Sequence, residues 1–123
     1  MSKILMSIKP EFVEKILNGE KKYEYRKTLP KKNIDKIIIY STYPIKKIVG
    51  EVEVKNVLID NIDVIWSKTK NYSGTNKEFF LSYYKNKNKA IAYELGEIKL
   101  YNPPLLLSDF NIKFSPQSFI YLD

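Results

Sequence analysis

The sequence predicts a small mixed barrel of the α+β class, formed by one domain over residues 1–123. Its length and a hydrophobic content of 44% suffice for one core without disulfides or a metal. Several segments have the length and patterning of strands, and helix-like segments lie at their joins. We find no internal repeat, low-complexity tail or linker that would divide the chain.

The N-terminal third predicts a strand, a helix and a second strand. Residues 4–8 are strand-like, and Pro10 suits the first position of a helix that Gly19 would end. Residues 22–27 then alternate strictly, so Glu24 and Arg26 are expected on one face of a strand. Side chains two positions apart on a strand are close enough to contact each other or to share a ligand.

The rest of the chain predicts four more strands and two more short helices. Thr75 and Glu78 have the spacing of a capping box, which predicts that Thr75 caps the second of these helices. The strand over residues 90–101 is expected to bend or break near Gly96. The other expected elements are strands over 34–42, 45–59 and 118–122 and a helix over 62–70.

Composition restricts the chemistry available to this chain. It contains neither cysteine nor histidine, which removes thiol nucleophiles, disulfides, Cys/His zinc sites and histidine bases. The acidic residues have no spacing typical of a metal site, so neither a metal nor a cofactor is expected. Apolar runs are too short to span a bilayer, and we expect a cytoplasmic protein that does not bind membranes. The net charge of +7 favours an anionic partner, with nucleic acid first.

Arg26 is the most informative single residue. It is the only arginine among 21 basic residues, all the others being lysine. Arginine differs from lysine in offering a planar, permanently charged fork that can grip a carboxylate, a phosphate or a base edge with two hydrogen bonds. The position therefore indicates a ligand contact or a structural pair with Glu24.

Gly19, Lys21, Glu24 and Arg26 together match the pattern G-x-K-x-x-E-x-R, which resembles the signature of the ASCH domains, a branch of the PUA-like fold. The resemblance extends to residues 5–12, 40–44, 48–52 and 115–119 and so covers nearly the whole chain. It implies a PUA-like β-barrel with an N-terminal helix and a cleft into which Lys21, Glu24 and Arg26 project.

The resemblance also implies several activities. ASCH domains were proposed to bind RNA; some small relatives remove acetyl from acetylcytidine, and others are ribonucleases. In an enzyme, the resemblance would make Lys21 catalytic, together with Glu24, although the acetylcytidine enzymes have threonine at the position of Glu24. A lysine next to other cations in a partly dry cleft would have a lowered pKa, whereas pairing with Glu24 would raise that pKa.

The first hypothesis is therefore a protein that binds RNA or a modified nucleoside or nucleotide, with a role in RNA metabolism. The alternatives are a small amidohydrolase or ribonuclease, and a structural network in which Glu24 neutralises both cations. Gln117, the only glutamine, could read a base edge or cap a turn. The candidate ligand-binding residues are Lys21, Lys22, Glu24, Arg26, Ser41, Gln117 and Ser118. The sequence does not determine the oligomeric state.

Overall fold

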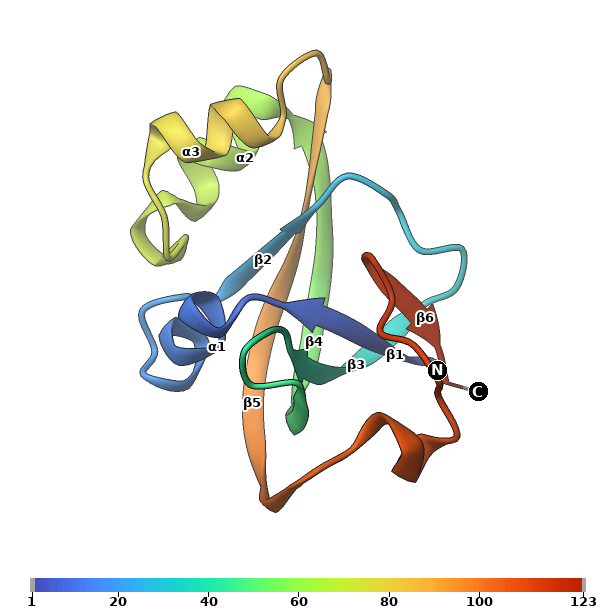
Figure 1. Ribbon diagram of the computed structural model, residues 1–123. Helices are drawn as coiled ribbons and strands as arrows, with labels where there is room; N and C mark the ends of the chain where they lie inside the picture. The colour runs from blue at the N-terminus through green and yellow to red at the C-terminus, as the bar shows by residue number, and fades with distance from the viewer. Residues whose placement is uncertain (1, 123) are drawn as a thin grey trace.

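Six strands form one curled, mixed sheet that makes a half-barrel in the computed structural model, which describes residues 2–122 (Figure 1). Their order across the sheet is β2-β5-β4-β3-β1-β6. β1 runs parallel to β3, and the other neighbouring strands pair antiparallel. The strands are β1 (Ser2–Ile8), β2 (Tyr23–Arg26), β3 (Ile34–Ser41), β4 (Lys47–Asn61), β5 (Lys89–Leu105) and β6 (Phe119–Tyr121). The α+β barrel class predicted from the sequence is confirmed.

Within residues 2–122, three α-helices and two short 3-10 helices lie at the joins between strands. They are α1 (Pro10–Leu17), α2 (Ile62–Thr69), η1 (Lys70–Tyr72), α3 (Lys77–Tyr83) and η2 (Leu107–Phe110). Pro10 is the first residue of α1, as predicted, and Gly19 follows its end with a φ of 85°. A glycine adopts this left-handed conformation without steric cost, which lets the chain turn directly into the motif.

The cap of α3 differs from the prediction. The helix begins one residue later than a capping box at Thr75 requires, and Asn76 is the capping residue. The Asn76 side-chain oxygen accepts a hydrogen bond from the Phe79 backbone N–H at 2.8 Å. Asparagine and threonine both cap helices well, so sequence spacing alone did not choose between adjacent candidates.

β5 is one long strand and does not break at Gly96. Its pairing with β4 instead shifts register on both sides of Val54, close to Gly96. A Cβ added at Gly96 would meet the carboxylate end of the Glu53 side chain, so the glycine lets that side chain lie close against β5. Between Val52 and Val54 the extra residue lies in β5, in the stretch that contains Gly96, and between Val54 and Asn56 it lies in β4, so the irregularity predicted near Gly96 is present without a break in the strand.

The buried side chains form three clusters along the sheet. The largest lies inside the half-barrel and includes Ile4, Ile37 and Tyr93. A second joins β2 and β5 to the helices α2 and α3 through Tyr25, Ile65 and Phe80. The third packs Leu5 and its neighbours against the C-terminal segment. No helix in the described part of the chain is both long enough and apolar enough to cross a membrane.

Candidate functional site

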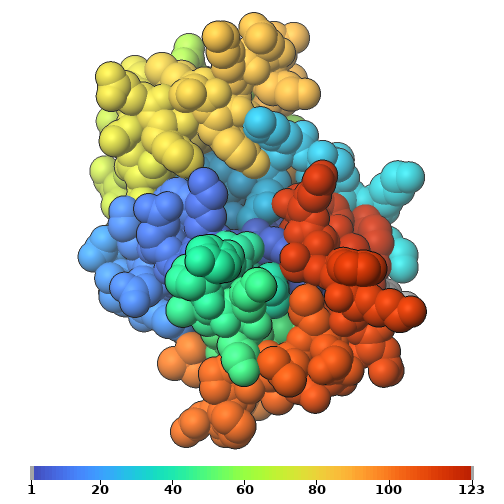
Figure 2. Space-filling view, in the orientation of Figure 1, coloured from blue at the N-terminus to red at the C-terminus, as the bar shows by residue number. Residues whose placement is uncertain are grey.

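A cavity of about 340 Å³ opens where β2, the start of α1, α3 and the segment before β6 meet. Figure 2 shows a hollow at this junction, with the green loop that follows β3 and the red C-terminal segment on its sides. The residues that line the cavity are Ser7, Lys9, Phe12, Lys21, Glu24, Tyr25, Arg26, Thr42, Thr75, Phe79, Phe80, Tyr83, Ser115, Pro116 and Gln117.

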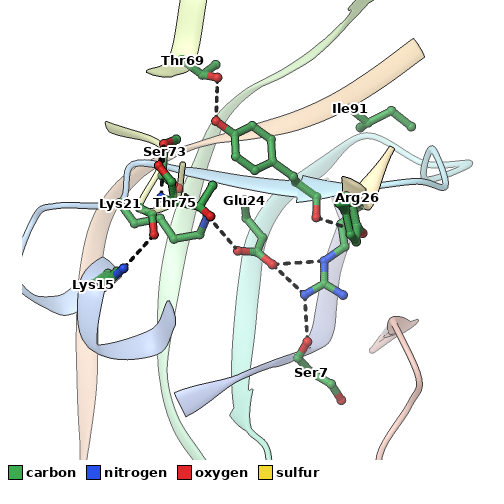
Figure 3. Close-up of polar contacts among 12 residues, drawn as sticks. Ser7, Lys15, Lys21, Glu24, Arg26, Thr69, Ser73, Thr75 and Ile91 are labelled. Carbon is green, nitrogen blue, oxygen red and sulfur yellow. Dashed lines mark hydrogen bonds and ion pairs between the residues drawn. The ribbon is translucent and has the colours of Figure 1, made fainter. Parts of the chain in front are cut away.

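Glu24 and Arg26 form a close pair at the base of this cavity. The Arg26 Nε and Nη2 atoms both donate to Glu24 Oε2, at 3.1 and 2.7 Å. Nη2 also donates to the Ser7 backbone carbonyl at 2.8 Å (Figure 3). Since Ser7 belongs to β1 and Arg26 to the edge strand β2, the guanidinium bridges the open side of the half-barrel. The contact predicted between Glu24 and Arg26 is present.

Lys21 reaches the same carboxylate from the opposite side. Its Nζ lies 3.7 Å from Glu24 Oε1 and donates to the Ser73 backbone carbonyl at 2.8 Å. Nζ also lies 5.1 Å from the centre of the Phe12 ring and 4.8 Å from that of Tyr25. The residue is only 4% exposed, so the ammonium group sits between a carboxylate and two aromatic faces with little access to solvent.

Burial lowers the pKa of Lys21 below its ordinary value of 10.5, because desolvation disfavours the charged amine. The carboxylate of Glu24 opposes this effect and the guanidinium of Arg26 reinforces it, but desolvation is the largest cause of the lowered pKa. The sequence left the balance between these influences open, and the structure indicates that burial prevails. A lysine with a lowered pKa has a larger fraction of neutral amine available as a base.

The backbone around Lys21 is held by hydrogen bonds to elements on both sides. The Lys21 N–H donates to the Lys15 carbonyl of α1, and the Lys22 N–H donates to the Tyr72 carbonyl of η1. Gly74, with a φ of 71°, passes against the aliphatic stem of Lys21, where an added Cβ would lie 2.7 Å from the Lys21 Cβ. The conformation of Gly74 therefore makes room for the buried lysine.

Aromatic rings form much of the cavity wall above these charges. Phe12 of α1 and Phe79 of α3 meet edge to face, with ring centres 5.8 Å apart. Tyr83, the last residue of α3, lines the cavity together with Arg26. Its hydroxyl donates to the Tyr25 carbonyl at 3.3 Å. A mainly aromatic wall with a few charged groups at its base is the usual composition of a small-molecule pocket.

The structure brings together four of the seven candidate ligand-binding residues. Lys21, Glu24, Arg26 and Gln117 line the cavity. The other three candidates, Lys22, Ser41 and Ser118, do not line the cavity. Lys22 is exposed, with its Nζ 4.4 Å from the centre of the Tyr72 ring; Ser41 is buried; and the Ser118 carbonyl accepts from the Ser7 N–H.

Only weak features of the sequence indicate the other residues of the site. Thr42, the first residue of the turn after β3, lines the cavity, whereas Ser41 at the end of β3 does not. Phe12 and Tyr83 carry the spacing of buried helix faces, which indicates packing without indicating a cavity. The backbone carbonyls of Ser7 and Ser73 accept hydrogen bonds from Arg26 and Lys21, respectively. A backbone acceptor cannot be predicted from the pattern of side chains.

The architecture and the site both agree with one domain family. The family model of the ASCH domain matches residues 6–102, which is most of the chain and includes the motif. The chain therefore belongs to the ASCH domain family.

Curated relatives show where similar sequences occur. The chain is 26% identical over 122 residues to the "ASCH domain-containing ribonuclease" of Zymomonas mobilis, covering 96% of this chain and 82% of that protein. It is 32% identical to part of "Large ribosomal subunit protein uL22" of Ureaplasma parvum, covering 97% of this chain but 39% of that protein. It is also 27% identical to part of "ATP synthase subunit alpha" of the same species, again over 97% of this chain, but only 15% of that protein.

Solved structures agree with the fold. The crystal structure of ASCH from Zymomonas mobilis superposes with a TM-score of 0.88 at 25% identity, covering 98% of this chain and 87% of that chain. A mutant form of the same protein gives a TM-score of 0.90 at 23% identity, covering 100% of this chain and 91% of that chain. The half-barrel is thus the PUA-like fold that the motif implies.

Proposed function

We propose that this ASCH domain binds RNA, or a nucleotide-like fragment of it, in the cavity above Lys21, Glu24 and Arg26. The observation that carries the proposal is a cavity of about 340 Å³ with aromatic walls and these three charged groups at its base. Aromatic faces suit the stacking of a base, and the polar groups suit its edge or its phosphate.

The charges at the base of the cavity have capacity left for a ligand. The hydrogen bonds of Arg26 use Nε and Nη2, and its Nη1 has no partner among the described residues. Gln117 lines the cavity and is exposed, and its carboxamide has both donors and an acceptor. Together these groups could bind the edge of a base or a phosphate oxygen.

Two further observations favour an RNA ligand. The net charge of +7 attracts an anionic polymer. The Zymomonas mobilis relative named as a ribonuclease aligns with 96% of this chain. The chain spans only 15% and 39% of the lengths of the two Ureaplasma parvum proteins.

A second candidate function is cleavage of the bound RNA. It is favoured by the position and lowered pKa of Lys21, whose neutral amine could accept a proton from a ligand hydroxyl while Arg26 holds the phosphate. Hydrolysis of a modified nucleoside such as acetylcytidine would use the same lysine.

The proposal can be tested by fluorescence polarisation with labelled short RNAs, for wild type and for Lys21→Met, Arg26→Lys and Lys22→Ala. Lys22→Ala is the matched control, because it removes the neighbouring positive charge outside the cavity. We expect Lys21→Met and Arg26→Lys to weaken binding about tenfold or more, Lys22→Ala to weaken it far less, and wild-type affinity to fall as salt rises.

Product analysis of the same mixtures separates binding from turnover. If wild type produces shortened RNA and Lys21→Met does not, the protein cleaves RNA. If wild type releases acetate from acetylcytidine, it is an amidohydrolase. If Arg26→Lys lowers the melting temperature but RNA affinity is equal in all four proteins, Glu24 and its cations are a structural network and the proposal is wrong.

A further inference from the structure

Two strongly exposed aromatic side chains belong to the two segments that adjoin the cavity. Phe114 is 82% exposed and Tyr43 is 78% exposed, the highest values among the large hydrophobic side chains of residues 2–122. The next, Leu100, is 57% exposed. Exposed aromatic surface is unfavourable in water, so side chains this exposed, each next in sequence to a residue that lines the cavity, indicate a binding surface.

Both aromatic residues adjoin residues that line the cavity. Tyr43 follows Thr42, and Phe114 precedes Ser115, although the two loops are far apart in the sequence. In Figure 2 these two segments, green and red, lie on the sides of the hollow.

The C-terminal end of β1 anchors both loops. The Thr42 N–H donates to the Ile8 carbonyl at 3.0 Å. The Ser7 hydroxyl donates to the Pro116 carbonyl at 2.7 Å, and the Ser7 N–H donates to the Ser118 carbonyl at 3.0 Å. The backbone carbonyl of Ser7 accepts a hydrogen bond from Arg26, so both loops are attached to the strand that also contacts the guanidinium.

Positive charge accompanies these aromatic residues. Lys9 lines the cavity, the Lys46 Nζ lies 6.0 Å from the centre of the Tyr43 ring, and Lys113 directly precedes Phe114. Exposed aromatic rings interleaved with lysines are the arrangement by which proteins bind single-stranded nucleic acid, since bases stack on the rings and phosphates contact the amines.

We infer that Tyr43 and Phe114 are stacking platforms for the nucleotides next to the one in the cavity, so that the ligand is a short strand with unpaired bases. This inference rests on the proposed function and extends it from one nucleotide to its neighbours. A free mononucleotide fills the cavity only, whereas a strand also contacts the two loops.

The test compares a mononucleotide with a pentanucleotide of the same base, using adenylate, cytidylate and uridylate in turn. Isothermal calorimetry would be run on wild type, Tyr43→Ala, Phe114→Ala and Leu100→Ala. Leu100→Ala is the matched control, because Leu100 is exposed but not among the cavity-lining residues. Phe114→Trp retains an aromatic face and Phe114→Leu retains only apolar surface, and circular dichroism checks that each variant is folded.

We expect the pentanucleotide to bind wild type more tightly than the mononucleotide. Tyr43→Ala and Phe114→Ala should each weaken pentanucleotide binding between about 5-fold and about 150-fold, and leave mononucleotide binding unchanged. Phe114→Trp should preserve the affinity and Phe114→Leu should not. The deoxyribose pentanucleotide, run in parallel, should lose affinity by the same factor in each variant, because stacking involves the base and not the sugar.

Two results would overturn the inference and leave the proposed function standing. One is equal affinity of wild type for the mononucleotide and the pentanucleotide. The other is a pentanucleotide affinity that falls in Lys21→Met but not in Tyr43→Ala or Phe114→Ala. If wild type binds neither ligand, the proposed function is wrong and the inference fails with it.

Discussion

Lys21, Glu24 and Arg26 show how single residues hold charge in a nearly dry site. Each would be costly to bury alone, and each has charged or backbone partners that offset the cost. Both oxygens of Glu24 face cations, Oε1 towards Lys21 and Oε2 towards Arg26. Removing Glu24 would therefore leave two cations in like-charge repulsion.

Gly74 and Gly19 provide a matched pair of substitutions. Both have positive φ values, so replacement by alanine costs about 1 kcal/mol or more of stability at either position. An alanine Cβ at position 19 meets open space, whereas at position 74 it meets the Cβ, Cγ and Cδ of Lys21 at 2.7, 2.8 and 2.9 Å. We expect Gly74→Ala to destabilise the protein by about 1–3 kcal/mol more than Gly19→Ala, measured by urea unfolding. Equal losses would mean that Lys21 moves aside freely.

The lowered pKa of Lys21 predicts a pH dependence of stability. Below its folded-state pKa the buried amine must carry a charge, which opposes folding; the unfolded chain keeps the ordinary value of 10.5. Between these two values the unfolded state binds more protons, so the contribution of Lys21 to stability becomes more favourable as pH rises. We expect the stability of wild type relative to Lys21→Met to increase as the pH rises towards the ordinary lysine pKa of 10.5, measured by urea unfolding.

The pH dependence of stability due to Lys21 must be measured below the pH at which the tyrosines ionise, because their ionisation also changes stability. Burial raises the pKa of Tyr25 and of Tyr93 to about 12, and raised tyrosine pKa values make stability fall as pH rises above about 10. A stability difference between wild type and Lys21→Met that does not change with pH below this limit would contradict a lowered pKa for Lys21.

At the scale of elements, α3 supplies much of the cavity wall, and its start is the most easily tested feature. Asn76 caps the helix through its side-chain oxygen, whereas Thr75 bonds to the Ser73 hydroxyl through its backbone N–H and carbonyl. We expect Asn76→Ala to cost about 1 kcal/mol of stability and Thr75→Ala about 0.5 kcal/mol or less, measured by thermal unfolding. The reverse order would restore Thr75 as the cap.

The short edge strand β2 positions two of the charged residues of the motif, Glu24 and Arg26. Its four residues pair with β5, and just before the strand Lys21 makes a separate bridge to Ser73, which follows η1. Strict alternation within so few residues places Glu24 and Arg26 on one face. Lys21 reaches Glu24 from the turn after α1, and its position depends on Gly19 and Gly74.

At the scale of the whole molecule, the sequence predicted the fold better than the site. Strands and helices follow from periodicity, and their ends were displaced by only a few residues, as at α3 and β5. The motif correctly indicated Glu24 beside Arg26, because that contact is local. The cavity needs Ser7, Thr42 and Gln117 to meet from distant parts of the chain, and periodicity carries no information on such meetings.

Main-chain oxygen atoms position both cations of the site: the carbonyl of residue 7 for the guanidinium and that of residue 73 for the ammonium. Every amino acid supplies this acceptor, so substitutions at those two positions that preserve the backbone path leave the acceptors in place. Related proteins could thus differ at both positions and still fix their lysine and arginine in the same way. Comparison of side chains would identify the charged groups but overlook what orients them.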